Sequence, residues 1–181
     1  MNAQNILQTL TSADALRSLI FTLISMGIGA FITYRFLFFI YRKEMKLFRN
    51  FKRKLVVLAP ENKYGLNINM KDEVDVIQKN PLFKSLPIER HSSRLAINNN
   101  VDKDCMVILG IGNDFTYFKE VFDRAKNFNI PLIVYTYGDS KALTKDHWNL
   151  LNSYQWYSVC NTPLRLISEI FNILSTFDFK S

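Results

Sequence analysis

Glycines and short polar residues gather directly after one apolar stretch, in the segment 110–114 of the sequence. Gly110, Gly112, Asn113 and Asp114 follow the apolar run 105–109 and precede an amphipathic segment. Glycine lets a backbone approach a ligand closely or turn tightly, and a helix N-terminus favours anions. The segment has neither the GxGxxG spacing nor the GK[ST] residues of a P-loop. A phosphate or ribose contact and a plain tight turn are therefore both open interpretations.

Two further loops carry side chains that suit phosphate binding. Lys141 follows the apolar run 132–135, and Asn161 and Thr162 follow the run 157–160. If these runs are parallel strands, their carboxyl ends share one edge of a sheet, where open α/β folds bind ligands. We therefore predict a ligand site that combines Lys141, Asn161 and Thr162 with segment 110–114. The alternative for Lys141 is a solvated loop lysine.

The sequence offers little for catalysis or metal binding. It has neither a G-x-S-x-G nor an HExxH motif, and His91 and His147 lack the spacing of metal ligands. Cys105 and Cys160 fall in apolar runs and are expected to be small core residues. Glu120 lies about one turn into the amphipathic segment, where a surface carboxylate is the simplest interpretation. We expect no metal ion and no cofactor, and no catalytic residue unless Glu120 is one.

The elements that would position these residues alternate along the chain. Apolar runs at 55–59, 105–109, 132–135 and 157–160 indicate strands buried on both faces, and 86–91 is a fifth candidate. Segments 69–79, 114–128, 144–153 and 163–177 have the apolar spacing of helices, whereas the asparagines 98–100 suggest a loop. This order predicts an α/β domain with a five-stranded parallel sheet, Rossmann-like or flavodoxin-like, with helices on both faces.

A long apolar segment precedes this domain. Residues 18–41 contain one charged residue, Arg35. As a helix they would rise about 36 Å, enough to cross a hydrocarbon core of about 30 Å. Arg35 is expected to snorkel to headgroups, and the alternative is a charge that lines a pore or contacts another helix in an oligomer. Small residues such as Ser25 and Gly29 permit helix–helix contact.

The positive charge of the chain is concentrated behind this segment. The net charge is +7, and residues 42–54 hold seven lysines and arginines against one acidic residue. The positive-inside rule then places the C-terminal side in the cytoplasm. We expect a short extracytoplasmic N-terminus (1–17), a transmembrane helix (18–41), a basic juxtamembrane linker (42–54) and a cytosolic domain (55–181), in a single-pass protein of the inner membrane. Because residues 55–181 are charge-balanced, bulk nucleic-acid binding is not expected.

This layout resembles small membrane-anchored effectors of bacterial antiviral defence. In CRISPR-associated membrane proteins with CARF-type domains, a short transmembrane segment is fused to a Rossmann-like sensor of cyclic oligoadenylates. The resemblance covers the order of span, basic junction and α/β domain, together with strand-end loops such as 109–114. It implies a homo-oligomer that binds a nucleotide second messenger and acts on the lipid bilayer.

A second resemblance is to TIR-like domains. Residues 106–120 followed by 129–133 look like the third strand, its helix and the fourth strand of that family, which implies that Glu120 is the catalytic glutamate of a membrane-tethered NAD-cleaving enzyme. A third hypothesis is a non-catalytic protein-interaction domain. We expect a nucleotide sensor, with these two as alternatives.

Overall fold

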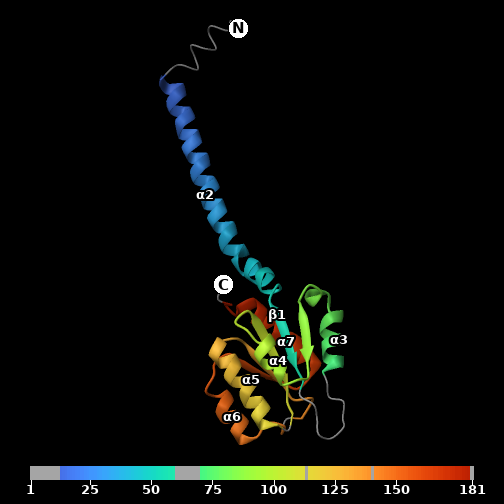
Figure 1. Ribbon diagram of the computed structural model, residues 1–181. Coiled ribbons are helices and arrows are strands. Elements are labelled where there is room, and N and C mark those ends of the chain that lie inside the picture. Colours follow the sequence, from blue (N-terminus) through green and yellow to red (C-terminus); the bar gives the residue numbers. More distant parts are fainter. Residues whose placement is uncertain (1–12, 60–69, 113, 140, 180–181) are drawn as a thin grey trace. The chain divides into compact units, whose positions relative to one another are not determined.

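The computed structural model describes residues 13–59, 70–112, 114–139 and 141–179 (Figure 1). Contacts within the chain define two compact units, Met1–Lys43 and Glu44–Ser181. The first unit contains most of helix α2 (Ala13–Asn50), and the second is an α/β domain.

Helix α2 carries the predicted membrane-spanning segment. Its residues Ala15–Arg42 form a 28-residue stretch that is long and apolar enough to cross a membrane, and none of that window is buried. Large apolar side chains such as Phe21, Ile32 and Phe39 are exposed on all sides. A helix that is apolar all round suits lipid rather than the surface of a soluble domain.

The helix extends further than expected. We expected residues 42–54 to form a linker, but residues 42–50 are helical and only 51–53 form a turn before the first strand. This stretch contains no glycine or proline, so nothing in it breaks a helix. In addition, Leu47 and Phe51 pack against the apolar core of the second unit, which holds this end of the helix in place.

The second unit is built on a five-stranded, all-parallel sheet, as predicted. The strands are β1 (Lys54–Leu58), β2 (Ile88–His91), β3 (Cys105–Gly110), β4 (Leu132–Tyr135) and β5 (Tyr157–Cys160), in the order β2-β1-β3-β4-β5. The register places Val56 beside Val107, and Ile108 beside Ile133. Strands β3 and β4 are fully buried, which explains their continuous apolar runs. This is the flavodoxin-like arrangement.

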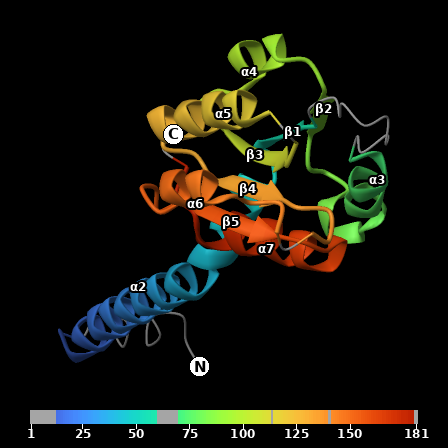
Figure 2. The ribbon, with the colours of Figure 1, turned by 90° about the horizontal axis from the view of Figure 1, so that it is seen from below.

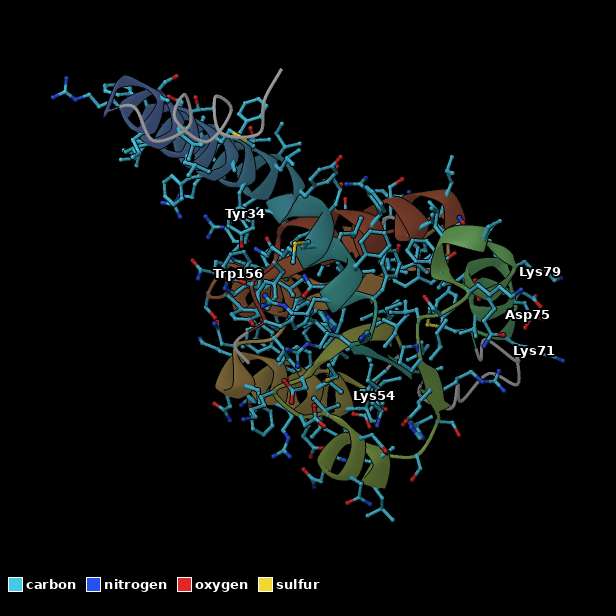
Figure 3. The ribbon with its side chains drawn as sticks, turned by 90° about the horizontal axis from the view of Figure 1, so that it is seen from above. Tyr34, Lys54, Lys71, Asp75, Lys79 and Trp156 are labelled. Atoms are coloured by element: carbon cyan, nitrogen blue, oxygen red, sulfur yellow. The ribbon has the colours of Figure 1, made fainter. Side chains whose placement is uncertain are left out.

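Helices cover both faces of the sheet (Figure 2). Helices α4 (Leu95–Asn100), α5 (Phe115–Phe128) and α6 (Lys145–Leu151) lie on one face, and α3 (Lys71–Lys79) and α7 (Pro163–Thr176) on the other. A 3₁₀ turn, Pro81–Phe83, follows α3 and buries Phe83. Helix α3 shows the amphipathic pattern: Val74 and Ile77 face the sheet, and Lys71, Asp75 and Lys79 lie along its outer side (Figure 3).

Helix α4 corrects the prediction of a loop at residues 98–100. The sequence has few helix-forming residues there, and the contacts that hold the helix come from elsewhere. Ala96 and Ile97 are buried, and the Arg124 guanidinium donates to the carbonyl oxygens of Asn98 and Val101, each at 3.2 Å. Arg124 thus satisfies carbonyls that the end of a short helix leaves without a partner.

The C-terminal end of α7 is held by the last turn of α2. Asn50 is fully buried, and its Nδ2 donates to the carbonyl oxygens of Leu174 (2.8 Å) and Phe177 (3.1 Å). Lys46 Nζ donates to the Thr176 carbonyl at 2.9 Å. Residues more than 120 positions earlier in the sequence therefore cap α7.

Candidate functional site

The predicted ligand site lies at the carboxyl edge of the sheet. The strand order reverses between β1 and β3, because the chain runs from β1 outward to β2 and then returns to the other side of β1. Open α/β sheets bind ligands at such a point. Gly110 ends β3 there, and Lys141, Asn161 and Thr162 follow β4 and β5 at the same edge. Asn113 and residues 60–69, which follow β1, lie outside the described residues.

Tyr137, from the loop after β4, fills the space above Gly110. A Cβ atom added to Gly110 would come within 2.0 Å of the Tyr137 hydroxyl oxygen and 3.1 Å of the Met70 sulfur. The glycine is therefore required by the close approach of another side chain in this structure. Met70 itself adopts a left-handed conformation, with a φ of 54°, just before α3.

The turn that presents Tyr137 is conformationally costly. Tyr137 and Gly138 have φ angles of 52° and 86°, and the Asp139 N–H donates to the Thr136 carbonyl across the turn. Positive φ is natural for glycine but strained for a bulky tyrosine. Strained residues of this kind cluster at ligand sites and switch regions. The Tyr137 ring also contacts that of Tyr135, with the ring centroids 5.0 Å apart.

The helix N-termini at this edge are already partly capped. Asp114 Oδ1 accepts from the N–H groups of Thr116 (2.9 Å) and Tyr117 (3.2 Å). Thr162 Oγ1 accepts from the Arg165 N–H at 3.4 Å. Both residues thus act as N-caps. An anion at α5 would meet the Asp114 carboxylate, so α5 is less suited to phosphate than its sequence suggested.

Lys141 and Asn161 are exposed in adjacent loops. The Lys141 N–H donates to Asp139 Oδ1 at 2.8 Å, which orders the start of its loop. The Asn161 carbonyl oxygen lies 3.9 Å from the position that a Cβ on Gly138 would take, so the loops after β4 and β5 are neighbours. The edge therefore combines a lysine, an amide and a threonine, with Tyr137 between them and Gly110.

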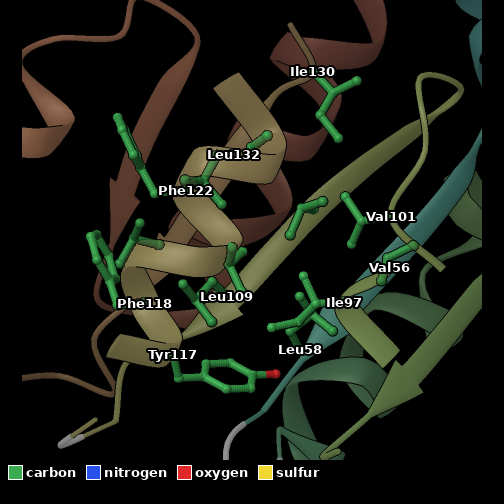
Figure 4. Close-up of a cluster of buried hydrophobic side chains, with 14 of the residues drawn as sticks. Val56, Leu58, Ile97, Val101, Leu109, Tyr117, Phe118, Phe122, Ile130 and Leu132 are labelled. Atoms are coloured by element: carbon green, nitrogen blue, oxygen red, sulfur yellow. The ribbon is translucent and has the colours of Figure 1, made fainter. Parts of the chain in front are cut away.

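Tyr117 is a candidate that sequence reasoning missed. It is only 4% exposed, and its hydroxyl has no hydrogen-bond partner among the described residues. The side chain stands at the rim of the buried cluster that includes Leu109 and Phe118 (Figure 4). Burial, and secondarily the charge of Glu120, raises the pKa of Tyr117 to about 12. The only signal in the sequence is a hydroxyl-bearing residue on the buried face of a predicted helix.

Tyr117 also lines a narrow hollow at the end of β3. The hollow is too small to hold even a water molecule, and Gly110, Gly112, Asp114 and Phe118 are among the residues that surround it. A buried hydroxyl without a partner is costly, and a polar ligand atom that reached it would remove that cost. The hollow is much smaller than the 300–1,000 Å³ typical of ligand pockets. A nucleotide could enter only if surrounding side chains moved.

Glu120 is engaged in an ion pair away from this hollow. The Arg94 guanidinium binds both carboxylate oxygens of Glu120, with 2.6 Å between Nε and Oε2. This pairing lowers the pKa of Glu120 and keeps it ionised. The pair lies in an open groove of about 560 Å³ between α4 and α5. Both oxygens of the residue that the TIR-like resemblance singles out are thus occupied by Arg94.

His147 is buried against the start of α5. It is 5% exposed, its ring contacts those of Phe115 and Phe118 edge-on, and its Nε2 has no partner in the described part of the chain. The Thr144 N–H donates to Nδ1 at 3.2 Å, so Nδ1 accepts and the proton of the neutral ring is on Nε2. Burial lowers the pKa of His147.

We therefore expect the domain to lose stability in mild acid. The unfolded chain binds a proton on His147 below about pH 6.5, whereas the folded chain resists it. The stabilising contribution is complete above pH 6.5 and is lost as the pH falls through the lowered folded pKa, at up to about 1.4 kcal/mol per pH unit. Urea unfolding between pH 4.5 and 7.5 measures this slope. His147→Gln should make the slope shallower, and an unchanged slope would assign it to other groups.

Among the described residues, no group of three or more His, Cys, Asp or Glu side chains could hold a metal ion. Cys105 and Cys160 are both buried and unpaired, and burial raises the pKa of each thiol to about 11. Neither thiol is therefore prepared for nucleophilic chemistry.

Comparisons with known proteins identify no family. No protein-family model and no curated protein matches the sequence. One solved structure, described as the O-acetylhomoserine sulfhydrylase of Wolinella succinogenes, aligns with 59% of this chain at 14% identity and a TM-score of 0.34. The alignment covers 33% of that protein, and a similarity at this level carries no functional argument. The fold and the residues at the carboxyl edge of the sheet therefore show only a flavodoxin-like domain that follows an apolar helix.

Proposed function

We propose that this protein is a membrane-anchored sensor whose α/β domain binds a nucleotide second messenger at the carboxyl edge of its sheet. The observation that carries the proposal is the buried hydroxyl of Tyr117, which has no partner among the described residues and belongs to a residue that lines the hollow beside the β1/β3 reversal. A base or ribose group supplies hydrogen-bonding atoms for such a hydroxyl, and Lys141, Asn161 and Thr162 suit a phosphate on the same edge.

Binding at this edge requires Tyr137 to move. Its ring occupies the space above Gly110, and its backbone is held at an unfavourable φ. A ligand that takes this space would let the turn relax, so it would favour one arrangement of the loops over the other. Such differential binding is the only way in which a ligand can shift a conformational equilibrium.

Helix α7 offers a route from this edge to α2. It begins at Thr162 and Pro163, beside the proposed phosphate contacts, and its far end is capped by Asn50 and Lys46 of α2. Its 14 residues span about 21 Å. Helix α2 continues without a break from Asn50 into the apolar stretch Ala15–Arg42. A shift of α7 would therefore act on the end of the membrane helix.

The cellular setting remains part of this proposal. The bias of lysine and arginine toward residues 42–54 supports an inner-membrane protein with a cytoplasmic C-terminal domain. The resemblance to antiviral effectors suggests a cyclic oligoadenylate or a similar messenger, and membrane action by a homo-oligomer. Because Cys105 and Cys160 are buried, an introduced N-terminal cysteine can be labelled selectively. If that cysteine were labelled only after permeabilisation, the orientation would be reversed.

We expect a cyclic nucleotide to raise the melting temperature of the full chain in detergent. At a ligand concentration of one hundred Kd, binding adds about 2.7 kcal/mol to the free energy of unfolding, which corresponds to several degrees. Cyclic oligoadenylates, cyclic dinucleotides and NAD would be compared, with NAD consumption followed in parallel. Lys141→Glu should weaken the shift. Lys103→Glu, the same charge change in the loop before β3, is the control.

Each other outcome supports a different function. Consumption of NAD that Glu120→Gln abolishes would support the TIR-like enzyme. Absence of any shift would favour a protein-interaction domain. An equal loss in the Lys141 and Lys103 variants would place the phosphate contact away from this edge.

A further inference from the structure

Strand β5 ends the sheet with hydrogen-bonding groups that point outward. The carbonyl oxygens of Trp156 and Cys160 accept from the N–H groups of Leu132 on β4 and of Thr136 directly after it, each at 2.9 Å. Because hydrogen-bonding direction alternates along a strand, the N–H and C=O groups of Tyr157 and Val159 point away from β4. Within the described ranges, no strand follows β5 in the sheet order. Among the described residues, no backbone hydrogen bond outside the sheet reaches these four groups.

The two edges of the sheet differ in charge. Strand β2 forms the opposite edge and consists of Ile88-Glu89-Arg90-His91, and Lys54 pairs with Glu89 at 2.6 Å. Charged side chains on an edge strand discourage pairing with another chain. Strand β5 reads Tyr157-Ser158-Val159-Cys160 and carries no charge. It is preceded by Trp156, which is 40% exposed (Figure 3). The charged residues of β2 therefore discourage pairing with another strand at that edge of the sheet, whereas the uncharged β5 does not.

We propose that β5 pairs antiparallel with β5 of a second copy of this chain, which joins two sheets into one. A twofold axis through Ser158 would set Tyr157 opposite Val159 of the second copy, and Val159 opposite its Tyr157. The outward groups of these residues then form two hydrogen-bonded pairs with four hydrogen bonds, and Ser158 lies opposite itself in the non-hydrogen-bonded position between them.

Several features favour a second copy over a foreign strand. After a twofold rotation, the outward N–H groups of one β5 face the outward C=O groups of the second β5. The strand can therefore pair with a copy of itself, as an isologous interface requires. Because β5 has no charged side chain, pairing two copies of it brings no like charges together. Helix α7, which contacts β5, exposes Leu164 and Phe171 two turns apart. This pairing does not depend on the proposed ligand.

Disulfide trapping tests the register directly. Opposed residues in a non-hydrogen-bonded pair have Cα atoms about 4.5 Å apart, within the range for a disulfide. Ser158→Cys in the full chain, in native membranes under mild oxidation, should give a crosslinked dimer. Glu89→Cys, the middle position of the charged edge, is the matched control and should stay monomeric. Both variants carry Cys160→Ser, because Cys160 lies 4.0 Å from the Ser158 hydroxyl. Equal crosslinking at both positions, or none at Ser158, would overturn the proposal.

Charge exchange provides a second and independent measurement. Like charges directly opposite each other destabilise a strand pair, and opposite charges stabilise it. Ser158→Lys alone and Ser158→Glu alone should each raise the dimer dissociation constant at least tenfold, measured by light scattering in detergent. A mixture of the two variants should restore the dimer, which also shows that both fold. If either variant alone dimerised as tightly as the wild-type chain, or if the mixture stayed monomeric, a twofold axis at Ser158 would be excluded.

Discussion

Replacing Asn50 by alanine is expected to lower the free energy of unfolding of the α/β domain by about 1–3 kcal/mol, since the loss of its donor is partly offset by the removal of its buried Oδ1, which has no partner among the described residues. Asn50 is fully buried, and its amide is the donor for the carbonyls of Leu174 and Phe177. Both partners are acceptors, so the amide orientation is unambiguous. Without the donor, two carbonyls at the end of α7 remain buried and unpaired. The melting temperature should fall by about 5–10 °C.

The neighbouring residue provides the control for this experiment. Arg49 pairs with Asp178 at 3.5 Å, but both side chains are largely exposed, and such surface pairs contribute little. Arg49→Ala should therefore change the stability by less than about 1 kcal/mol. Unfolding of the full chain in urea can be followed by the fluorescence of Trp156, whose ring contacts that of Phe177 edge-on beside this contact. Equal losses in the two variants would show that Asn50 is not specifically required.

Much of the fold was predictable because its strands are buried on both faces. The runs at 105–109 and 132–135 have no polar alternation, and both are central strands with no exposed residue. The helix predicted at 114–128 begins and ends within one residue of α5 (Phe115–Phe128), since Asp114 is a standard N-cap. By contrast, α4 depends on Arg124, and the last turns of α2 depend on Leu47 and α7. Such tertiary contacts leave no local pattern in the sequence.

The candidate site was predictable as a place but not as a set of interactions. Strand order alone puts Gly110, Lys141 and Asn161 at one edge. That Tyr137 lies over Gly110 depends on a positive φ two residues after β4, which its tyrosine side chain argues against. The sequence likewise does not predict that the Tyr117 hydroxyl lacks a partner among the described residues. A tyrosine beside Phe118 indicates only an apolar helix face. Places where local rules fail in this way are often functional.

Replacing Tyr117 by phenylalanine should make the unliganded protein more stable by about 1–2 kcal/mol and weaken its stabilisation by a cyclic nucleotide. The hydroxyl is buried without a partner among the residues that the structure describes, so its removal relieves a desolvation cost. The ring, which packs in the core beside Phe118, is unchanged. A substitution that raises stability while it impairs binding is typical of a residue retained for function. The measurement is urea unfolding of the full chain with and without the nucleotide.

Tyr154→Phe is the matched control, since it removes a hydroxyl that has partners. Tyr154 donates to the Ile130 carbonyl at 2.6 Å, close to the Ala125 carbonyl at 3.3 Å, and is 7% exposed. Its loss should lower stability by about 1–2 kcal/mol and leave the nucleotide effect intact. If Tyr117→Phe were destabilising to the same degree, its hydroxyl would have a partner in the unliganded protein. If it were stabilising but the nucleotide effect persisted in full, Tyr117 would not contact the ligand, and the observation that carries the proposed site would be lost.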